Sequence, residues 1–470
     1  MSRFAVVACL PFASAFLATL FLAGCIQPVK YERPAVELPD AWKETAPRFA
    51  EDGRWWRIYD DAALDAVVDE ALSGNGDLLV AAARVDEARG LLGEANSLFW
   101  PSIDAQAAAS RQQISTRTAT AFPGIPTEYS NHRATLNVSY ELDLFGRLRA
   151  NAAAARAELE GSEASREAVR LALAAQVAKS YFSLRSFDEQ VNLTRRNVAL
   201  REEALGLQRK RFQGGVISEY ELRQLEAEAA SVRALLPPLE RDREREEVAL
   251  SVLLGRSPKQ VFEGVVNVRQ AADEMPGPPA VPSGLPSELL LRRPDLVEAE
   301  RQLAAVNARV AVARAEMFPS ISLSAFYGSE SAALANLFAG GSAATWQVAA
   351  ALTQPIFQGG RLQARSDAAQ ARERAALAQY QQAIRSAFGE VRTALIAQSR
   401  ARESYEAESA REAALTQTLR LARLRYQNGV ASQLDVLDAE RGLLSAQIAR
   451  VEALRAHRAA VADLFRALGG

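Results

Sequence analysis

The sequence is poor in the residues that usually build reactive sites. Its 470 residues include two cysteines and two histidines, and aromatic residues make up only 7%. Two cysteines cannot form a disulfide framework, and the histidines, His132 and His457, are too far apart for the spacing of a metal site. The sequence also shows no Ser/His/Asp set and no phosphate-binding loop. We therefore predict no enzymatic activity, no cofactor and no metal.

Strong charge of one sign and long apolar runs are also lacking. The chain has 55 Lys+Arg against 57 Asp+Glu, a formal net charge of −2. This balance argues against a nucleic-acid-binding protein with a strong basic field. After residue 25 the sequence has no apolar run of about 18 residues, which excludes a spanning α-helix there. If the mature chain crosses a membrane, it must do so as a closed β-barrel.

The N-terminus has the features of a secretory signal at residues 1–24. A basic residue precedes the apolar stretch Phe4 to Leu22, and small residues lead to Cys25 in the sequence Leu-Ala-Gly-Cys. Pro11 argues against the alternative, a transmembrane helix. The pattern resembles a bacterial lipoprotein signal, so we predict cleavage before Cys25 and lipidation of this residue. Ile26, rather than Asp, follows it, which implies sorting to the outer membrane.

Two halves of the chain share one plan. Segment 209–218 matches segment 423–432 at an offset of 214 residues, and segment 99–103 matches 317–321 at an offset of 218. Units of about 200 residues are much longer than solenoid repeats. The predicted divisions are an N-terminal anchor and equatorial segment at 25–76, a first structural repeat at 77–255, a Pro-rich linker at 256–294 and a second structural repeat at 295–470.

Each half is predicted to form a helix, two strands, a very long helix, a tight turn and a return helix. The long helices are expected at 147–212 and 361–426, where the sequence has no proline. At 1.5 Å per residue each would be about 100 Å long, which a compact globule cannot house. Ser218 and Ser432 are expected to cap the return helices. Pro237-Pro238 must break or bend the first of them.

Alternating apolar and polar residues predict the strands. The pattern runs from Thr135 to Leu144 and recurs at 321–327 and 346–353. It fits either a half-buried sheet in a soluble protein or a barrel wall with lipid outside and water inside. Four strands cannot close a barrel, which needs about eight, so copies of the chain would have to pool their strands.

The first long helix carries two apolar rows with seven-residue spacing. One row is Val177, Leu184, Val191, Val198, Leu205 and Phe212. The other, Leu193, Leu200 and Leu207, lies about 200° around the helix. A single row would make a simple coiled coil, whereas rows on opposite sides predict a neighbour on each side, as in a closed ring of helices.

Several motifs, in their order and spacing, resemble those of the TolC family. They are Trp55-Trp56, Asn75 before Asp77-Leu78, Leu253-Leu254-Gly255-Arg256-Ser257-Pro258, Arg292-Arg293-Pro294-Asp295, Phe318-Pro319-Ser320, Gln354-Pro355-Ile356-Phe357, Gly359-Gly360-Arg361, and Tyr426 and Gly429 followed by Asp435-Val436-Leu437-Asp438-Ala439. The lipidated outer-membrane efflux proteins of the NodT and OprM type are the most similar branch. The resemblance covers essentially the whole mature chain. Pro237-Pro238 departs from TolC itself, which has an uninterrupted helix there.

The resemblance implies a mainly α fold with a small β portion. It implies a homotrimer in which a twelve-stranded β-barrel continues into a twelve-helix periplasmic α-barrel. Such a protein is the outer-membrane exit duct of a tripartite efflux system, lipid-anchored and extending into the periplasm. Its partners would be a periplasmic adaptor and an inner-membrane pump of the resistance-nodulation-division (RND) type. The alternatives are a type I secretion channel and, in another class, a coiled-coil periplasmic lipoprotein scaffold without a channel.

The resemblance also assigns site residues. Asp435 and Asp438, three residues apart and so on one helix face, would line the closed periplasmic gate, where a carboxylate ring favours cations. Without the resemblance they are two surface acids, and the first-half equivalents are Glu221 and Gln224. The helix-tip turns, with Gly214, Gly215, Val216, Asn428, Gly429 and Val430, are predicted to contact the adaptor. The strand-to-helix transitions are predicted at Gly146, Pro355, Gly359 and Gly360.

Overall fold

The computed structural model describes residues 33–34, 53–115, 117, 127–264 and 292–470. The predicted signal at 1–24 and Cys25 lie outside these residues. In chain order the main elements are η1 (Trp55–Tyr59), α2 (Ala62–Gly74), α3 (Gly76–Ser97), β1 (Ser102–Gln113), β2 (Glu128–Leu142), α4 (Arg147–Gln213), α5 (Glu219–Ala234), α6 (Leu236–Leu253), α7 (Pro258–Glu263), α9 (Pro294–Ala315), β3 (Ser320–Ser331), η2 (Leu334–Asn336), β4 (Ala344–Thr353), α10 (Arg361–Gln427) and α11 (Gln433–Leu468).

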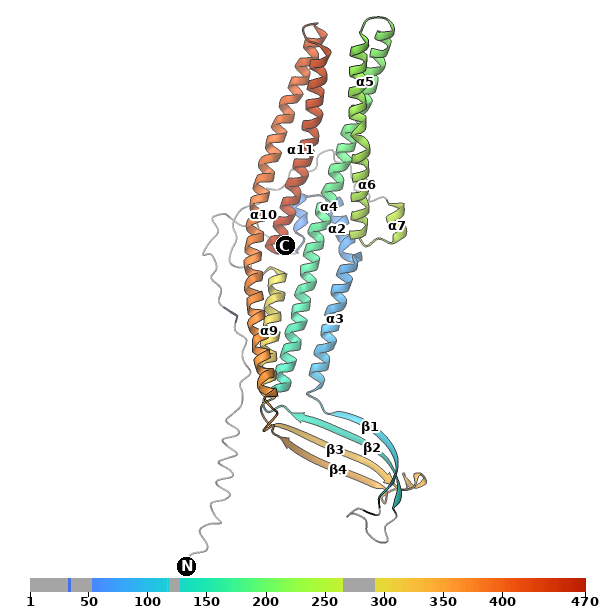
Figure 1. Cartoon of the computed structure of the whole chain (residues 1–470), viewed down its shortest axis with the longest axis vertical. Helices are drawn as coiled ribbons and strands as arrows, with labels where there is room; N and C mark the ends of the chain where they lie inside the picture. Colours follow the sequence, from blue (N-terminus) through green and yellow to red (C-terminus); the bar gives the residue numbers. More distant parts are fainter. Residues whose placement is uncertain (1–32, 35–52, 116, 118–126, 265–291) are drawn as a thin grey trace, which may run out of the picture. The chain divides into compact units, whose positions relative to one another are not determined.

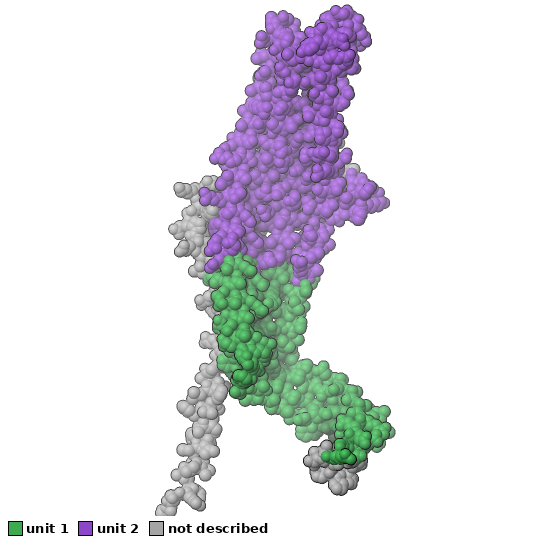
Figure 2. All heavy atoms as spheres, viewed as in Figure 1, with its two compact units in different colours: residues 1–35, 85–162, 299–380 green, residues 36–84, 163–298, 381–470 purple. Residues whose placement is uncertain are grey.

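These elements form two compact units, and each unit takes segments from both halves of the chain (Figure 2). Unit 1 comprises residues 1–35, 85–162 and 299–380, and unit 2 comprises residues 36–84, 163–298 and 381–470. The sheet belongs to unit 1, and the return helices α5, α6 and α11 belong to unit 2. Helices α3, α4, α9 and α10 contribute residues to both.

Unit 1 contains an antiparallel sheet in the order β1-β2-β3-β4 (Figure 1). The two halves meet at β2 and β3, where Leu136 lies opposite Tyr327, and Tyr327 in turn lies opposite Trp346 of β4. These three side chains share one face and are 53%, 65% and 71% exposed. A soluble antiparallel sheet normally buries its apolar face, so this exposed face is available to a further surface.

The strands predicted at 321–327 and 346–353 are confirmed as parts of β3 and β4. The predicted strand end at Leu144 is wrong, because β2 stops at Leu142. The Asp143 carboxylate instead accepts hydrogen bonds from the backbone amides of Leu148 and Arg149, at 3.1 and 2.9 Å. Asp143 thus satisfies free amides in the first turn of α4 and leaves the strand.

The long helices lie where the sequence predicts them. Helices α4 and α10 each extend one residue beyond the predicted ends, and the chain then turns through Gly215 and Gly429, with φ of 71° and 74°. A positive φ favours glycine because it has no Cβ. The break at Pro237-Pro238 is also confirmed, since α5 ends at Ala234 and both prolines fall in the first turn of α6.

The main core of unit 2 is built around the Trp55-Trp56 motif. Both indoles are 2% exposed, and Trp55 stacks on Phe465 of α11 with ring centroids 5.5 Å apart. The first predicted heptad row enters this core through Val177 and Leu184, which are fully buried. The main core therefore joins η1 to α4 and α11. None of the described helices carries a stretch that is both apolar and long enough for a bilayer crossing.

Candidate functional site

The candidate site lies at the turns that end α4 and α10 in unit 2. Ser218 and Ser432 cap the return helices, as predicted, and each forms a reciprocal capping box with the acid three residues later. In the second half, the Asp435 carboxylate accepts hydrogen bonds from the Ser432 amide at 2.7 Å and the Ser432 hydroxyl at 2.8 Å. Glu221 makes the same backbone contact to Ser218 at 2.8 Å. Asp435 and Glu221 therefore share one local structural role.

The two candidate gate acids both lie at the start of α11, and both are exposed. The hydrogen bonds from the Ser432 hydroxyl and amide lower the pKa of Asp435, so this carboxylate carries its charge to lower pH than a free aspartate. Asp438 lies 3.5 Å from a guanidinium nitrogen of Arg441 and has a side-chain exposure of 60%. Each acid therefore has a cationic or hydrogen-bonding partner within its own chain.

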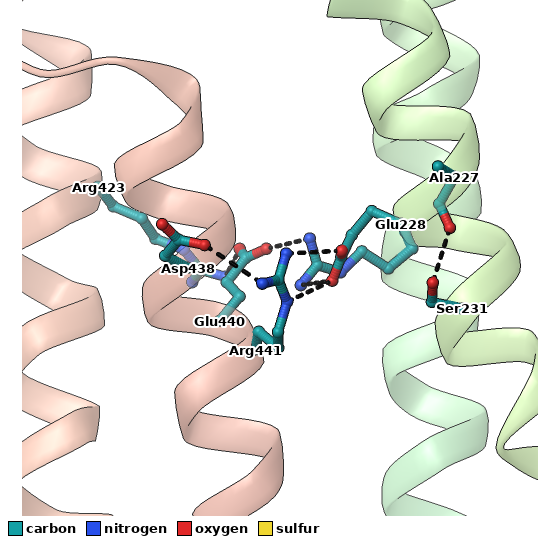
Figure 3. Close-up of polar contacts among 8 residues, drawn as sticks. Ala227, Glu228, Ser231, Arg423, Asp438, Glu440 and Arg441 are labelled. Atoms are coloured by element: carbon teal, nitrogen blue, oxygen red, sulfur yellow. Dashed lines mark hydrogen bonds and ion pairs between the residues drawn. The ribbon is translucent and has the colours of Figure 1, made fainter.

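A network of ion pairs joins the two helical hairpins close to this acid pair (Figure 3). Arg201 of α4 lies 3.0 Å from Glu440 of α11 and 3.8 Å from Glu228 of α5. Arg201 and Glu228 are largely buried, with side-chain exposures of 7% and 12%. The Arg201–Glu440 contact is an ion pair by distance, although the N–H direction does not align for a hydrogen bond. The buried Arg201 thus connects both hairpins.

Two exposed arginines complete the network. Arg423 of α10 lies 2.8 Å from Glu440, and Arg441 of α11 lies 2.9 Å from Glu228. Arg441 also faces Asp438, so one of the two candidate gate acids belongs to the network (Figure 3). With Arg201, three cations thus face three carboxylates, and the network is electrically balanced. We call this network, of residues 201, 228, 423, 438, 440 and 441, the hairpin bridge.

Apolar and amide contacts strengthen the same connection. Leu437 of α11 is 7% exposed and packs into a cluster with Leu205 of α4 and Leu222 and Leu225 of α5. Towards the turn, the Gln208 amide of α4 donates a hydrogen bond to the side-chain oxygen of Gln433, at 3.1 Å. Apolar burial, an amide hydrogen bond and ion pairs therefore all connect the two hairpins near residues 435 and 438.

A groove of about 930 Å³ runs between the hairpins beside the hairpin bridge. Its lining includes Leu200 and Leu207 of the second predicted heptad row, each 59% exposed. The first row is mostly buried, although Phe212 at its end is 37% exposed. In the second row Leu193 is buried, whereas Leu200 and Leu207 remain exposed.

The other predicted site residues lie at element ends. Val216 and Val430, in the two helix-tip turns, are 63% and 65% exposed. Gly146 precedes α4 with a φ of 77°, and Gly359 and Gly360 precede α10 with φ of 57° and 81°. Pro355 lies between β4 and α10. Within the described ranges no group of three or more His, Cys, Asp or Glu side chains could hold a metal ion.

Sequence reasoning missed the capping role of Asp435 and the hairpin bridge, for different reasons. The Ser-x-x-Asp spacing at 432–435 is a recognised signal of a capping box. Arg201 and Glu440 have no such signal, because they are 239 residues apart and sit among many exposed charges.

Comparison with known proteins agrees with this geometry. The sequence profile of the family described as "Outer membrane efflux protein" matches residues 67–256 and 285–470. The "Toluene efflux pump outer membrane protein TtgC" of Pseudomonas putida is 33% identical over 461 residues, which cover 96% of this chain and 93% of that protein. The "Outer membrane protein OprJ" of Pseudomonas aeruginosa is 34% identical over 468 residues, which cover 97% of this chain and 95% of that protein.

Solved structures give the same result for the fold. The crystal structure of the Campylobacter jejuni CmeC outer membrane channel superposes with a TM-score of 0.84 at 28% identity, covering 93% of this chain and 94% of that one. The predicted TolC-like fold class, mainly helical with a small sheet, is confirmed. The chain therefore belongs to the outer membrane efflux protein family, as its motifs predict.

Proposed function

We propose that this protein is the outer-membrane exit duct of a tripartite efflux system, passing cargo outward without catalysis. The observation that carries the proposal is the sheet of unit 1. Its apolar face, with Tyr327 and Trp346, is exposed, and its edge strands β1 and β4 have no further strand partner among the described residues. Such a sheet fits an assembly that sets the apolar face in lipid and pairs each edge with another copy.

An assembly of three copies would pair the edge strands β1 and β4, which have no further strand partner among the described residues of one chain. Edge pairing of β4 with the β1 strand of a second copy would combine three four-stranded sheets into twelve strands. The four helical columns of the hairpins would likewise combine into a ring around a lumen. Leu200 and Leu207 line the groove between the two hairpins, so the second neighbour of α4 on this side is the α10–α11 hairpin of the same chain.

The hairpin turns are the proposed gate of the duct. Asp435 and Asp438 would face the lumen near its narrow end, where three copies bring six carboxylates together and favour cations over anions. The hairpin bridge would hold the gate closed, because opening requires the α10–α11 hairpin to move away from α4 and α5. Its most buried member, Arg201, is the residue whose contacts with Glu440 would have to break.

The proposed partners are those that would contact the helix-tip turns and the lipid-bearing N-terminus. The helix-tip turns, with the exposed Val216 and Val430, would contact a periplasmic adaptor that connects the duct to an inner-membrane pump of the RND type. Cys25 is the proposed lipidation site, and its acyl chains would anchor the mature chain in the outer membrane.

Planar lipid bilayers provide the test of the duct and its gate. The purified protein should produce discrete ion currents. Replacing Asp435 and Asp438 together by alanine should raise the conductance or weaken block by multivalent cations. Glu221→Ala is the matched control, because it removes the equivalent capping acid from the other hairpin. Absence of currents from the folded protein would contradict the duct, and currents unchanged in both respects would contradict the gate residues.

A further inference from the structure

The two halves of the chain meet in unit 1 through one helix pair, α4 of the first half and α9 of the second. Arg301 of α9 lies 3.2 Å from Glu160 of α4, and Arg309 of α9 pairs with Glu158 of α4. The two acids are two positions apart, so they project from opposite flanks of α4. Helix α9 therefore covers the face of α4 that lies between them.

Small buried residues form the contact between these two helices. Ala154 and Ala157 of α4 are 3% and 9% exposed, and both lie between the two acids around the helix. Ala305 of α9 lies midway between the two arginines and is fully buried. Close helix packing with an ion pair on each flank thus joins the two halves within one chain.

The equivalent helices α10 and α3 carry the same surfaces without a cover. Helices α4 and α10 are both 67 residues long, and α3 and α9 are both 22 residues long, so residues can be matched one to one. The counterparts of Ala154 and Ala157 are Ala368 and Ala371 of α10. Both are exposed, so the described residues of one chain leave this face of α10 open.

The charges on these two open surfaces are complementary. In place of the acids that flank the covered face of α4, α10 carries Arg372 and Arg374. In place of the buried alanine at the centre of the α9 contact, α3 carries Glu87. All three residues are exposed, and none has a charged partner among the described residues. Two cations on α10 therefore match one acid on α3 in sign and in position.

Aromatic residues at the ends of the same helices show the same relation. Phe318, shortly after α9, stacks on Phe145, shortly before α4, with ring centroids 5.2 Å apart. The counterparts are Trp100, shortly after α3, and Phe357, shortly before α10. These two side chains are 76% and 89% exposed. The ring contact between the halves thus has two counterparts that remain exposed in one chain.

We propose that α10 of one copy receives α3 of the next copy, with Glu87 of the next copy seated between Arg372 and Arg374. The partner is a second copy, because α3 leads into β1 and α10 follows β4, the two opposite edges of the sheet (Figure 1). Glu87 lies at the level of the two α10 arginines, because its counterpart Ala305 lies midway between the α9 arginines that reach α4. The contact rests on the proposed function, which brings copies together edge to edge.

A carbodiimide cross-link tests whether the two surfaces touch. Arg372→Lys keeps the charge and supplies an amine, which carbodiimide joins directly to a carboxylate in contact with it. The full-length Arg372→Lys protein in detergent should give covalent dimers and trimers, and mass spectrometry should find residues 87 and 372 joined. Adding Glu87→Gln should remove this link. Assembled Arg372→Lys protein that lacks the link would overturn the contact.

Charge reversal measures the contribution of the contact to assembly. Glu87→Arg would place three cations together, so the assembled protein should dissociate at about tenfold higher concentration in sedimentation experiments. Combining it with Arg372→Glu and Arg374→Glu should restore the parent value. Dissociation of the Glu87→Arg protein within about twofold of the parent, or a triple variant as weakly assembled as Glu87→Arg, would overturn the contact.

Asp86→Arg is the matched control for charge reversal. Asp86 is exposed, pairs with Arg89 of its own helix, and lies about 100° from Glu87 around α3. Its reversal should change the dissociation concentration less than about twofold, and an effect as large as that of Glu87→Arg would overturn the specific role of Glu87.

The same experiments separate this contact from the proposed duct. Folded protein that stays single-copy would overturn the duct and the contact together. Protein that assembles and conducts ions, but neither links residues 87 and 372 nor responds to charge reversal, would overturn the contact alone.

Discussion

Replacing the buried Arg201 by methionine should favour the open form of the gate. The guanidinium is 7% exposed and lies 3.0 Å from Glu440 and 3.8 Å from Glu228. Methionine keeps much of the apolar stem but removes the charge that faces both hairpins. The change therefore acts on the contact that we propose must break during opening.

The size of the shift towards the open form depends on the cations that still pair with Glu440 and Glu228 in the variant. An exposed ion pair contributes about 0.2–1 kcal/mol, whereas removing one partner of a buried pair costs about 3–5 kcal/mol when the other charge is left uncompensated. Glu440 keeps Arg423 at 2.8 Å and Glu228 keeps Arg441 at 2.9 Å, so neither carboxylate loses its last cation. We therefore expect a value between these limits, about 1.5 kcal/mol, which shifts a two-state equilibrium about tenfold towards the open form.

Single-channel recording measures this shift as the fraction of time spent in the higher-conductance state. The control is Arg400→Gln in α10. It removes an exposed ion pair between Arg400 and Glu403 of the same helix and should leave the open fraction unchanged. Thermal unfolding checks that the Arg201→Met protein is folded. A folded Arg201→Met protein with the same open fraction as the parent would refute the role of the hairpin bridge.

Three further predictions concern stability and anchoring. Burial, reinforced by Arg402 and Arg458, lowers the pKa of His457, so the folded protein binds fewer protons than the unfolded chain. Stability should therefore fall as pH drops below the ordinary value of 6.5, and His457→Gln should flatten the dependence of the urea midpoint on pH. Trp55→Ala should lower the free energy of unfolding by about 3–5 kcal/mol, and an unchanged urea midpoint would contradict its place in the core. Cys25→Ser should abolish acylation, and intact-mass analysis that still shows lipid would exclude Cys25 as the lipidated residue.

The long helices could be predicted from sequence because their signals are local. Between Arg147 and Gln213 no proline interrupts the helix, and a glycine with positive φ ends the turn that follows. The predicted caps at Ser218 and Ser432 also depend on residues within a few positions. Local rules of this kind gave the bounds of α4 and α10 to within one residue.

Contacts between distant segments could not be predicted from local sequence signals. Strand β1 has the alanine-rich sequence Ser-Ile-Asp-Ala-Gln-Ala-Ala-Ala-Ser-Arg-Gln-Gln, a weak strand former that is held by pairing with β2. Arg201 and Arg33 look like ordinary charged residues in the sequence. Their partners, Glu440 and Glu300, become visible only when the fold brings segments more than 200 residues apart together.

The proposed duct requires several copies of the chain that share one wall and one lumen. Electron cryo-microscopy of the purified protein in detergent or nanodiscs tests this most directly. We predict a particle with threefold symmetry, in which β4 of each copy pairs with β1 of the next and the hairpins surround a continuous lumen. A folded single-copy particle without a lumen would contradict the proposed duct.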